Sequence, residues 1–537
     1  MYHYPSEERA LLQRRVDQFR GQVNRFLDGK LDEDEFKQLR LRNGLYMQRH
    51  APMLRVAIPY GVVSSEQLRT LATVSTRWDR GYGHMTTRQN IQFNWIPLKD
   101  TPDVLQALAD VDMHAIQTSG NCIRNITTDP LAGASADEYE DPRPWCELIR
   151  QWANFHPEFN WLPRKFKIAV SGAQHDRAAV EVHDIGLRIR HDNAGNTCFD
   201  VFVGGGLGRT PHIGKPIALA LPAADLLSYL EAILRVYNRH GRRDNIYKAR
   251  IKILVNALGI ATFQEQVDAE WQHTRQQVPT VDFDRVDELQ AQFATDLPER
   301  PAVDLDQVRA ENSKAFGSWL THNTRAHKRA GYRTVFVSLK HPSRAAGDIS
   351  DQQMRLLADL ADQHSQGELR ATHDQNLVLA HVPETDLPAL WQVLAPAMLA
   401  YPNIDTLTDM IVCPGLDYCS LANASSIAIW DQINAKFSEM DYLHDLGHIT
   451  VRVSGCMNAC GHHHVADIGV LGVEKKGVEW YQLTLGGRST AGAKIGQRLG
   501  PAIAKADVAD TVERILAVFA EQREPEESFN AFVERNG

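Results

Sequence analysis

The sequence has few cysteines, no long apolar run and no excess of basic residues. No stretch of 18 or more apolar residues occurs, which argues against a membrane-spanning helix. The first eight residues are polar and acidic and do not resemble a secretory signal, so we expect a cytoplasmic protein. The net charge of −9 and pI near 6.2 argue against a nucleic-acid partner, because such proteins normally carry a basic domain. Seven cysteines are too few, and odd in number, for a disulfide scaffold.

The composition is that of a large globular protein. Hydrophobic residues make up 43% and charged residues 23% of the 537 positions. At roughly 150 residues per domain, this length predicts about three or four domains. The cysteines are distributed unevenly: Cys122, Cys146 and Cys198 are scattered, whereas the other four lie close together near the end of the chain. In a reducing compartment, clustered cysteines are typical of metal binding.

The sequence contains an internal duplication. Three landmarks recur in the same order about 280 to 290 residues later, as expected for a repeated unit. Each copy reads as a strand, a capped helix and a second strand; in the first copy, residues 90–96 alternate as a half-buried strand should. The recurring segments are Thr86–Ile91 with Thr372–Leu377, Val170–Gly172 with Val453–Gly455, and Val201–Gly205 with Leu483–Gly487.

The two copies differ at positions that carry chemistry. The first has Arg88 where the second has Asp374, and Lys167 where the second has Thr450. The second has Cys456 at a position that is alanine in the first. One half is therefore predicted to hold an anion and the other a metal, with a shared site between them.

The clustered cysteines form two pairs, Cys413-x5-Cys419 and Cys456-x3-Cys460. Four thiolates bind either zinc or a [4Fe–4S] cluster. Structural zinc sites favour C-x2-C spacing, and covalent haem attachment needs C-x-x-C-H, so neither fits well. The following run His462–His464 is more typical of packing than of further ligands.

Several cations lie in or beside apolar, strand-like runs: Arg55, Arg88, Arg124, Lys165 and Lys167. On a strand, residues i and i+2 point to the same face, so the two lysines emerge together. Like charges on one face are unfavourable unless an anion neutralises them. A solvated strand edge is the alternative interpretation for the lysines alone.

With these motifs, the chain resembles the hemoprotein subunit of assimilatory sulfite reductases, within the siroheme sulfite and nitrite reductase family. The resemblance covers residues from about 30 to 520. It implies an α+β fold with a pseudo-two-fold internal duplication, each half being a ferredoxin-like α/β unit plus a larger α/β cofactor-binding unit. The expected divisions are a helical lead-in (1–50), ferredoxin-like half-domain 1 (51–116), siroheme- and substrate-binding domain 1 (117–265), a connector (266–330), ferredoxin-like half-domain 2 (331–400) and the [4Fe–4S]- and siroheme-binding domain 2 (401–537).

The resemblance also implies roles for particular residues. Cys413, Cys419, Cys456 and Cys460 would ligate a [4Fe–4S] cluster, and the Cys460 sulfur would also bind the siroheme iron. Arg55, Arg124, Lys165 and Lys167 would hold the substrate, while Arg88, Gln92 and Asn458 would lie near the macrocycle. Where some relatives have a further arginine, this chain has His84, which puts one carboxylate contact in doubt.

The implied reaction is the six-electron reduction of sulfite to sulfide in sulfur assimilation, with reduction of nitrite to ammonia as the alternative. Nitrite reductases of the family tend to have asparagine at the second lysine position, so Lys167 favours sulfite. The chain shows no flavin or NADPH domain, and we expect a separate electron donor, either a flavoprotein or a ferredoxin.

Two other classes of protein are less consistent with the sequence. The run Gly204–Arg209 follows a strand, as in a dinucleotide-binding loop, but G-x-G-x-x-G fails at Arg209. Its repeat partner at Gly486–Arg488 indicates a structural turn common to both halves instead. A non-enzymatic zinc scaffold is the second alternative.

Overall fold

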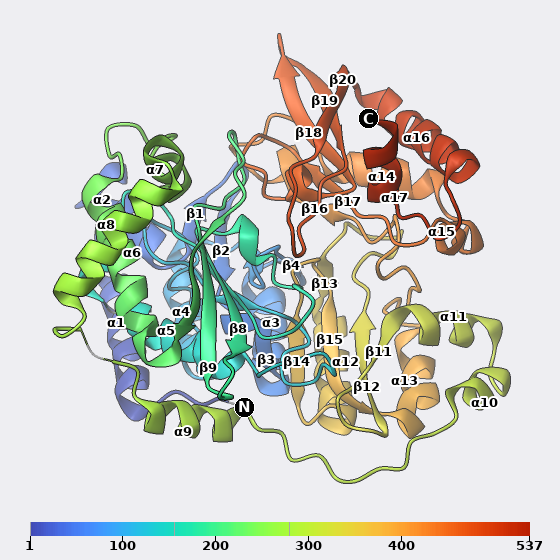
Figure 1. Cartoon of the computed structure of the whole chain (residues 1–537), viewed down its shortest axis with the longest axis horizontal. Helices are drawn as coiled ribbons and strands as arrows, with labels where there is room; N and C mark the ends of the chain where they lie inside the picture. Colours follow the sequence, from blue (N-terminus) through green and yellow to red (C-terminus); the bar gives the residue numbers. More distant parts are fainter. Residues whose placement is uncertain (1, 155, 279) are drawn as a thin grey trace.

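The computed structural model describes residues 2–154, 156–278 and 280–537. In these residues, four five-stranded sheets form two similar pairs. Each half of the chain contributes one antiparallel sheet of mostly short strands, called the small sheet, and one mixed sheet with longer strands, called the larger sheet. Figure 1 shows the halves side by side, joined across the bottom by one extended segment. The α+β duplication expected from the sequence is therefore confirmed.

The first small sheet follows two long helices at the start of the chain. Its helices cover one face, and an apolar stripe on each faces the strands. The elements are α1 (Ser6–Leu27), α2 (Glu33–Arg42), β1 (Leu45–Met47), β2 (Pro52–Val56), β3 (Val62–Ser64), α3 (Ser65–Trp78), β4 (Tyr82–Met85), β5 (Ile91–Phe93) and α4 (Thr101–Ala109).

The second small sheet repeats this plan. Its elements are α10 (Leu305–Ala310), α11 (Lys314–Asn323), β11 (Thr324–Ala326), β12 (Tyr332–Val337), β13 (Asp348–Ser350), α12 (Asp351–His364), β14 (Glu368–Ala371), β15 (Leu377–Pro383) and α13 (Leu387–Leu394). The strand β11 and the helices α10 and α11 lie within residues 266–330, so this stretch contains regular structure that packs on the second half.

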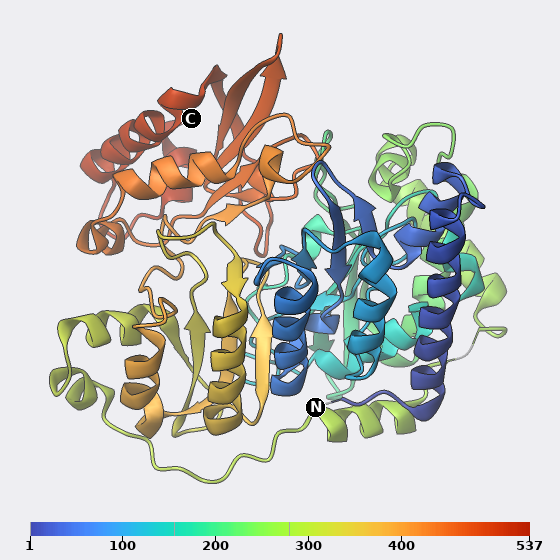
Figure 2. The ribbon, with the colours of Figure 1, turned by 180° about the vertical axis from the view of Figure 1, so that it is seen from behind.

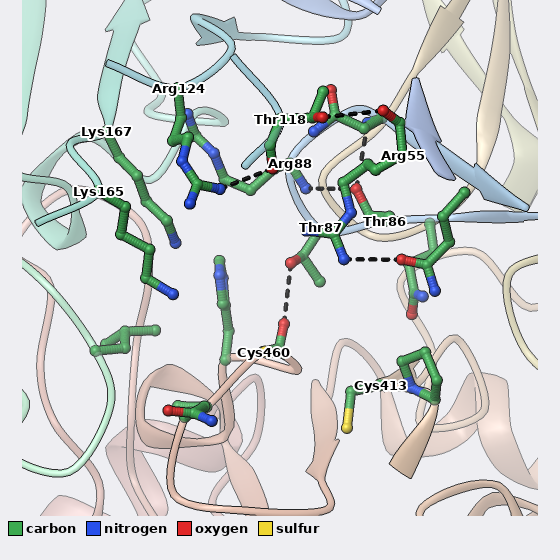
Figure 3. Close-up of a pocket in the computed structure, with 18 of the residues that line it drawn as sticks. Arg55, Thr86, Thr87, Arg88, Thr118, Arg124, Lys165, Lys167, Cys413 and Cys460 are labelled. Atoms are coloured by element: carbon green, nitrogen blue, oxygen red, sulfur yellow. Dashed lines mark hydrogen bonds between the residues drawn. The ribbon is translucent and has the colours of Figure 1, made fainter. Parts of the chain in front are cut away.

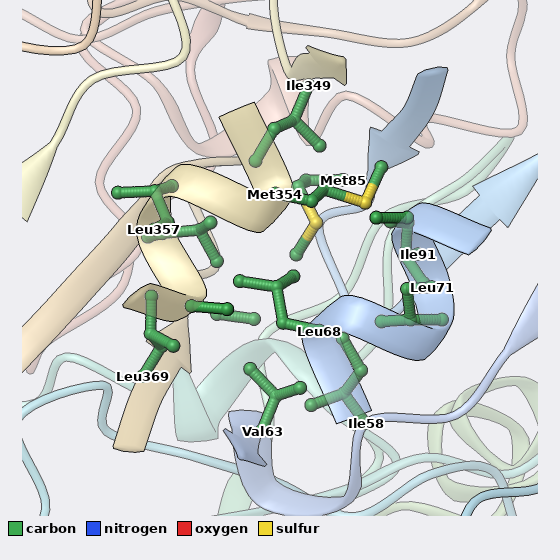
Figure 4. Packing of buried hydrophobic residues seen from close by; sticks show 14 of the residues in the cluster. Ile58, Val63, Leu68, Leu71, Met85, Ile91, Ile349, Met354, Leu357 and Leu369 are labelled. Carbon is green, nitrogen blue, oxygen red and sulfur yellow. The ribbon is translucent and has the colours of Figure 1, made fainter. Parts of the chain in front are cut away.

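The two small sheets exchange edge strands. Strand β3 pairs with β14 of the second half, with Ser64 opposite Glu368. Strand β13 pairs with β4 of the first half, with Ser350 opposite Tyr82. Helices α3 and α12, which follow the exchanged strands, pack together around Leu68, Met354 and Leu357 in one continuous core (Figure 4). Neither small sheet is complete without the other half.

Both exchanged strands lead into a capped helix. The hydroxyl of Ser64 accepts a hydrogen bond from the Gln67 backbone N–H, and the Gln67 side chain accepts one from the Ser64 N–H. Ser350 and Gln353 make the same reciprocal pair at α12. These capping boxes fix the direction in which each helix leaves the exchanged strand.

Loss of one cap should weaken the protein measurably. Ser350→Ala is expected to lower the free energy of unfolding by about 1 kcal/mol, because a helix N–H loses its partner. The shift of the urea midpoint at unchanged slope measures it. Ser350→Thr is the matched control and should lose less, and equal losses for both variants would contradict a capping role.

The two larger sheets share a mixed topology. Each begins with parallel strands and ends with antiparallel ones. The first contains β6 (Thr127–Thr128), β7 (Ile168–Ser171), β8 (Ile185–His191), β9 (Thr197–Val203) and β10 (Lys215–Pro222), with helices α5 (Arg143–Asn154), α6 (Leu226–His240), α7 (Ile251–Leu258), α8 (Ile260–Thr274) and α9 (Phe283–Phe293). The second contains β16 (Ile411–Val412), β17 (Val451–Ser454), β18 (Ile468–Lys475), β19 (Val478–Leu485) and β20 (Gln497–Ala504), with helices α14 (Ile427–Lys436), α15 (Met440–Leu446), α16 (Val508–Gln522) and α17 (Phe529–Asn536). Figure 2 shows this last unit above the second small sheet.

The structure tests two further details of the sequence analysis, one in the first small sheet and one in the first larger sheet. The expected half-burial of residues 90–96 was wrong for residues 90–94, which are buried on both faces of the strand. The glycine run after β9 opens a turn, in which Gly206 pairs with His212, and leads to β10 without a helix. The repeat partner Arg488 pairs with Lys494 in the same way, so the run is a structural turn, as predicted.

Candidate active site

A cationic pocket lies where the two halves meet. Its wall contains nine of the residues to which the sequence analysis gave a role, and they come from the first small sheet and from both larger units (Figure 3). They are Arg55, Arg88, Gln92, Arg124, Lys165, Lys167, Cys413, Asn458 and Cys460. Cys419 and Cys456 do not line the pocket, but both interact electrostatically with Cys460, which does.

Arg55 is held in the pocket by a cross-strand partner. It lies on β2 directly opposite Gln92 on β5, and its Nη2 donates to Gln92 Oε1 at 2.9 Å. Its buried Nε has no hydrogen-bond partner in the described structure. Gln92 therefore orients the guanidinium and leaves donor capacity for a bound anion.

Arg88 and Arg124 are anchored mainly by carbonyl oxygens. Arg88 donates to Asn125 O at 2.5 Å and to Thr127 Oγ1 at 2.8 Å, and burial lowers its pKa to about 9. Arg124 donates to Thr118 O and to Gly120 O, each at 2.8 Å. Within the described residues neither arginine has a carboxylate partner, so both keep uncompensated positive charge at the wall.

The two lysines lie immediately before β7 and both point into the pocket (Figure 3). Phe166, between them, pairs with Ile123, and the Lys167 N–H donates to the buried Asp184 carboxylate at 2.8 Å. Neither ammonium group forms a hydrogen bond or ion pair in the part of the chain that the structure describes.

Burial and neighbouring cations disfavour the charged form of both lysines. The pKa of Lys165 falls to about 7, mainly through burial and then through Arg124. The pKa of Lys167 lies well below its usual value, through burial and then through Arg88. A bound anion would reverse both effects, because an opposite charge at this distance favours the ammonium form.

The four clustered cysteines occupy one neighbourhood around Cys460. Burial, followed by the charge of Cys460, raises the pKa of Cys413 to about 12. Burial also raises the pKa of Cys419 and of Cys456, and the charge of Cys460 acts in the same direction. Binding a metal there requires thiolates, so it must release protons.

Glycines bring the backbone close around these cysteines. A Cβ on Gly455 would lie 2.5 Å from Ala424 O, and one on Gly461 would lie 2.1 Å from Val453 O. The Gly455 N–H donates to the Cys413 sulfur at 3.1 Å. Four cysteines that lie close enough to interact, with the Gly455 N–H as a donor to one sulfur, have the chemistry that a [4Fe–4S] cluster needs. The cations across the pocket fit a macrocycle rich in carboxylates.

Contacts across the halves hold the two sides of the pocket together. Thr87 Oγ1 donates to the Cys460 carbonyl at 2.9 Å. His464 Nε2 contacts the Gly208 carbonyl at 2.9 Å, while His463 is buried and His462 lines the pocket. The histidine run therefore packs and connects the halves, as the sequence analysis favoured.

His84 lies in the pocket where a further arginine was in question. Its Nδ1 contacts Asp348 Oδ1 at 2.8 Å, and Asp348 belongs to the exchanged strand β13. The second half thus supplies the partner that fixes the imidazole. A neutral or protonated imidazole at this position gives one fewer permanent cation than arginine.

Arg250 and Gln375 are among the pocket residues to which the sequence analysis gave no role. Arg250 forms a two-pronged ion pair with Asp184 at 2.8 Å and faces the pocket beside Lys167. Gln375 donates to Met85 O at 2.9 Å and to Val412 O at 3.1 Å. Arg250 precedes α7 in a loop without any motif, whereas Gln375 lies in the duplicated segment and carried a usable signal.

Cations facing Cys413 and Cys460 across one pocket, at the junction of the duplicated halves, fit a reductase of small anions that carries an iron–sulfur cluster. The chain belongs to the nitrite and sulphite reductase family. The family's 4Fe-4S domain matches residues 119–275 and 404–537, and its ferredoxin-like half domain matches residues 46–111 and 327–397. Membership implies siroheme and a [4Fe–4S] cluster as cofactors.

Individual relatives agree with this assignment. The chain is 28% identical over 496 residues to a sulfite reductase [ferredoxin] of Mycobacterium tuberculosis, covering 90% of this chain and 82% of that one. It is 30% identical over 483 residues to a ferredoxin–nitrite reductase of Synechococcus elongatus, covering 86% and 85%. The solved structure of the M. tuberculosis NirA protein matches with a TM-score of 0.77 at 26% identity, covering 94% and 91%. Among the described helices none has the length and hydrophobicity needed to cross a bilayer.

Proposed function

We propose that this chain reduces sulfite to sulfide with six electrons in sulfur assimilation. The observation that supports sulfite over nitrite is the pair Lys165 and Lys167, two unpaired ammonium groups facing one pocket with Arg55 and Arg124. Sulfite carries up to two negative charges and nitrite one, so a second lysine contributes more to sulfite binding. Reduction of nitrite to ammonia is the second candidate, supported by the nitrite reductases among the relatives.

Each side chain has a proposed role in this reaction. Cys413, Cys419, Cys456 and Cys460 would hold the cluster, with Cys460 also binding the siroheme iron, while Arg88, Gln92 and Asn458 would bind near the macrocycle. When bound, these cofactors supply the electrons and the metal that takes up the substrate. Arg55 and Arg124 would orient the oxyanion through their guanidinium forks.

The two lysines would move protons as well as hold charge. The ammonium groups of Lys165 and Lys167 lie at the pocket wall, within reach of an anion placed among the four cations. Each departing oxygen of sulfite leaves as water and needs protons, which an ammonium of lowered pKa donates readily. We propose that solvent then restores the lysine protons, since both side chains are only half-buried.

The electron donor is proposed to be a ferredoxin. The relatives from M. tuberculosis and S. elongatus are both named as ferredoxin enzymes, which supports this choice over a flavoprotein. The first experiment compares sulfite and nitrite turnover of the purified holoprotein with a chemical reductant. Faster sulfite turnover supports the proposal, and a strong nitrite preference would favour the second candidate.

Lys167→Asn should move the preference toward nitrite. Losing one ammonium group is expected to lower kcat/KM for sulfite at least tenfold relative to nitrite, because the dianion depends more strongly on that charge. Parallel assays with both substrates measure the ratio. Lys167→Arg keeps the charge and serves as the control, and an unchanged ratio in Lys167→Asn would remove Lys167 from substrate selection.

A further inference from the structure

A second cavity lies beside the catalytic pocket. It has a volume of about 750 Å³ and lies between α1, α2, the segment 116–123 and the segment 160–164. Gln117 lines both this cavity and the catalytic pocket. The segment from Gln117 to Arg124 thus forms a wall shared by the two spaces.

The charged residues that line this cavity are all cations. Within the described residues, no aspartate or glutamate lines it, and none of its cations forms an ion pair with a carboxylate. This is unusual in a chain of net charge −9. The cations come from α1, α2 and two loops: Arg15, Lys37, Arg42, Arg164 and Arg243.

These cations are held close together without an anion. The Arg42 guanidinium lies 4.2 Å from the ring centroid of Trp161, and Arg243 donates to the Trp161 carbonyl at 3.0 Å. Burial, followed by the charge of Arg42, lowers the pKa of Arg15. Several like charges in a half-enclosed space are unfavourable unless a negatively charged ligand binds among them.

Buried polar atoms in the cavity wall also lack partners. Asn154 is 5% exposed, and in the described structure neither its Nδ2 nor its Oδ1 has a hydrogen bond. Arg42 Nη2 and Gln117 Nε2 also have no hydrogen-bond partner within the described residues. Unsatisfied buried donors are costly, and each could be satisfied by a hydrated oxyanion.

The cations continue from this cavity into the catalytic pocket. Arg164 lines the cavity and the next residue, Lys165, lines the pocket. Arg124, at the end of the shared wall, faces the pocket. The pKa of Arg164 is lowered mainly by burial and then by the positive charge of Arg124. The side chain of Gln117 stands between the two spaces, and its Nε2 has no hydrogen bond to lose when it moves.

We propose that this cavity is an antechamber that collects the inorganic oxyanion substrate from solvent and passes it by Gln117 to the catalytic pocket. The proposal rests on the proposed function, because it takes the substrate to be a small oxyanion. A cleft lined by one sign of charge raises the local concentration of the opposite ion and its rate of association. It also gives the two helices of the N-terminal lead-in a role in catalysis.

Kinetics of the holoenzyme provide the first test. Arg42→Gln combined with Arg243→Gln is expected to lower kcat/KM for sulfite about tenfold through KM, and to flatten its dependence on ionic strength. The control combines Lys99→Gln with Arg514→Gln, two exposed cations outside both cavities, for the same change in net charge. Equal kcat/KM and equal salt dependence in the two double variants would overturn the antechamber.

A chemical probe tests the cavity without turnover. Cys122 lines it, is half-exposed, and donates to Ser119 O at 3.3 Å. A methanethiosulfonate reagent with a sulfonate group should label Cys122 about tenfold faster than one with a trimethylammonium group, and sulfate should slow the labelling. Cys122→Ser defines the background, and Arg42→Gln with Arg243→Gln should equalise the two rates.

Together, the two tests distinguish a failure of the antechamber proposal from a failure of the proposed function. Equal labelling rates in the unaltered protein would overturn the antechamber even if sulfite is reduced. If neither sulfite nor nitrite is reduced, the proposed function fails, and charge-selective labelling blocked by sulfate would still establish an oxyanion cavity.

Discussion

Replacing Lys167 with methionine is expected to lower kcat for sulfite by at least about 100-fold while both cofactors remain bound. The methionine keeps the length and apolar stem of the side chain but removes the charge and the transferable proton. Lys167 lies on the pocket wall opposite the cysteines and makes no side-chain hydrogen bond within the described residues, so the fold does not depend on its ammonium group. Steady-state turnover and the visible spectrum measure the two parts of this expectation.

Two comparisons make this result specific. Lys99→Met removes an exposed lysine outside the pocket and should leave kcat unchanged. Lys167→Met should also raise the pKa of its neighbour Lys165, because removing a nearby like charge favours the ammonium form. Normal turnover in Lys167→Met with intact cofactor absorption would remove this lysine from the mechanism.

Replacing Cys413 with serine is expected to abolish the iron–sulfur cluster, reduce siroheme content, and lower turnover of either substrate at least about 100-fold. Cys413 is the one cysteine of the first pair that lines the pocket, and its sulfur accepts the Gly455 N–H. A serine oxygen is a poor replacement for a thiolate in an iron–sulfur cluster. Iron and acid-labile sulfide analysis, together with the visible spectrum, measures the loss.

Cys122→Ser is the matched control for the cluster variant. Cys122 is a half-exposed cysteine that is not one of the four clustered cysteines, and its replacement should keep the iron content and the spectrum unchanged. A full cluster in Cys413→Ser would show that Cys413 is not a ligand. Zinc bound to the unaltered protein, in place of iron and sulfide, would contradict the cofactor assignment.

Local features of the fold and the site could be predicted from the sequence because they depend on short segments. The capped helix after Ser64, and its repeat after Ser350, follow from a serine and a glutamine three residues apart. The cysteine pairs have a fixed spacing, and Lys165 and Lys167, two residues apart in the extended segment before β7, point into the same pocket. All three signals lie within a few residues of the chain.

Features that depend on distant pairing could not be predicted. The ion pair of Arg250 with Asp184 joins a loop to a buried turn, and neither residue belongs to a motif. The burial of both faces of β5 depends on packing in the core on one face and on the pocket at Gln92 on the other, which its own alternation does not show. The exchange of β3 and β13 likewise leaves no local signal, because each strand looks complete in its own repeat.

The exchanged strands also determine when the protein can fold during synthesis. Strand β4 pairs with β13, which lies more than about 250 residues further along the chain, so translation leaves the β4 edge open for tens of seconds at ordinary rates. An open edge is prone to wrong pairing with other chains. We therefore expect the first half, expressed alone, to aggregate.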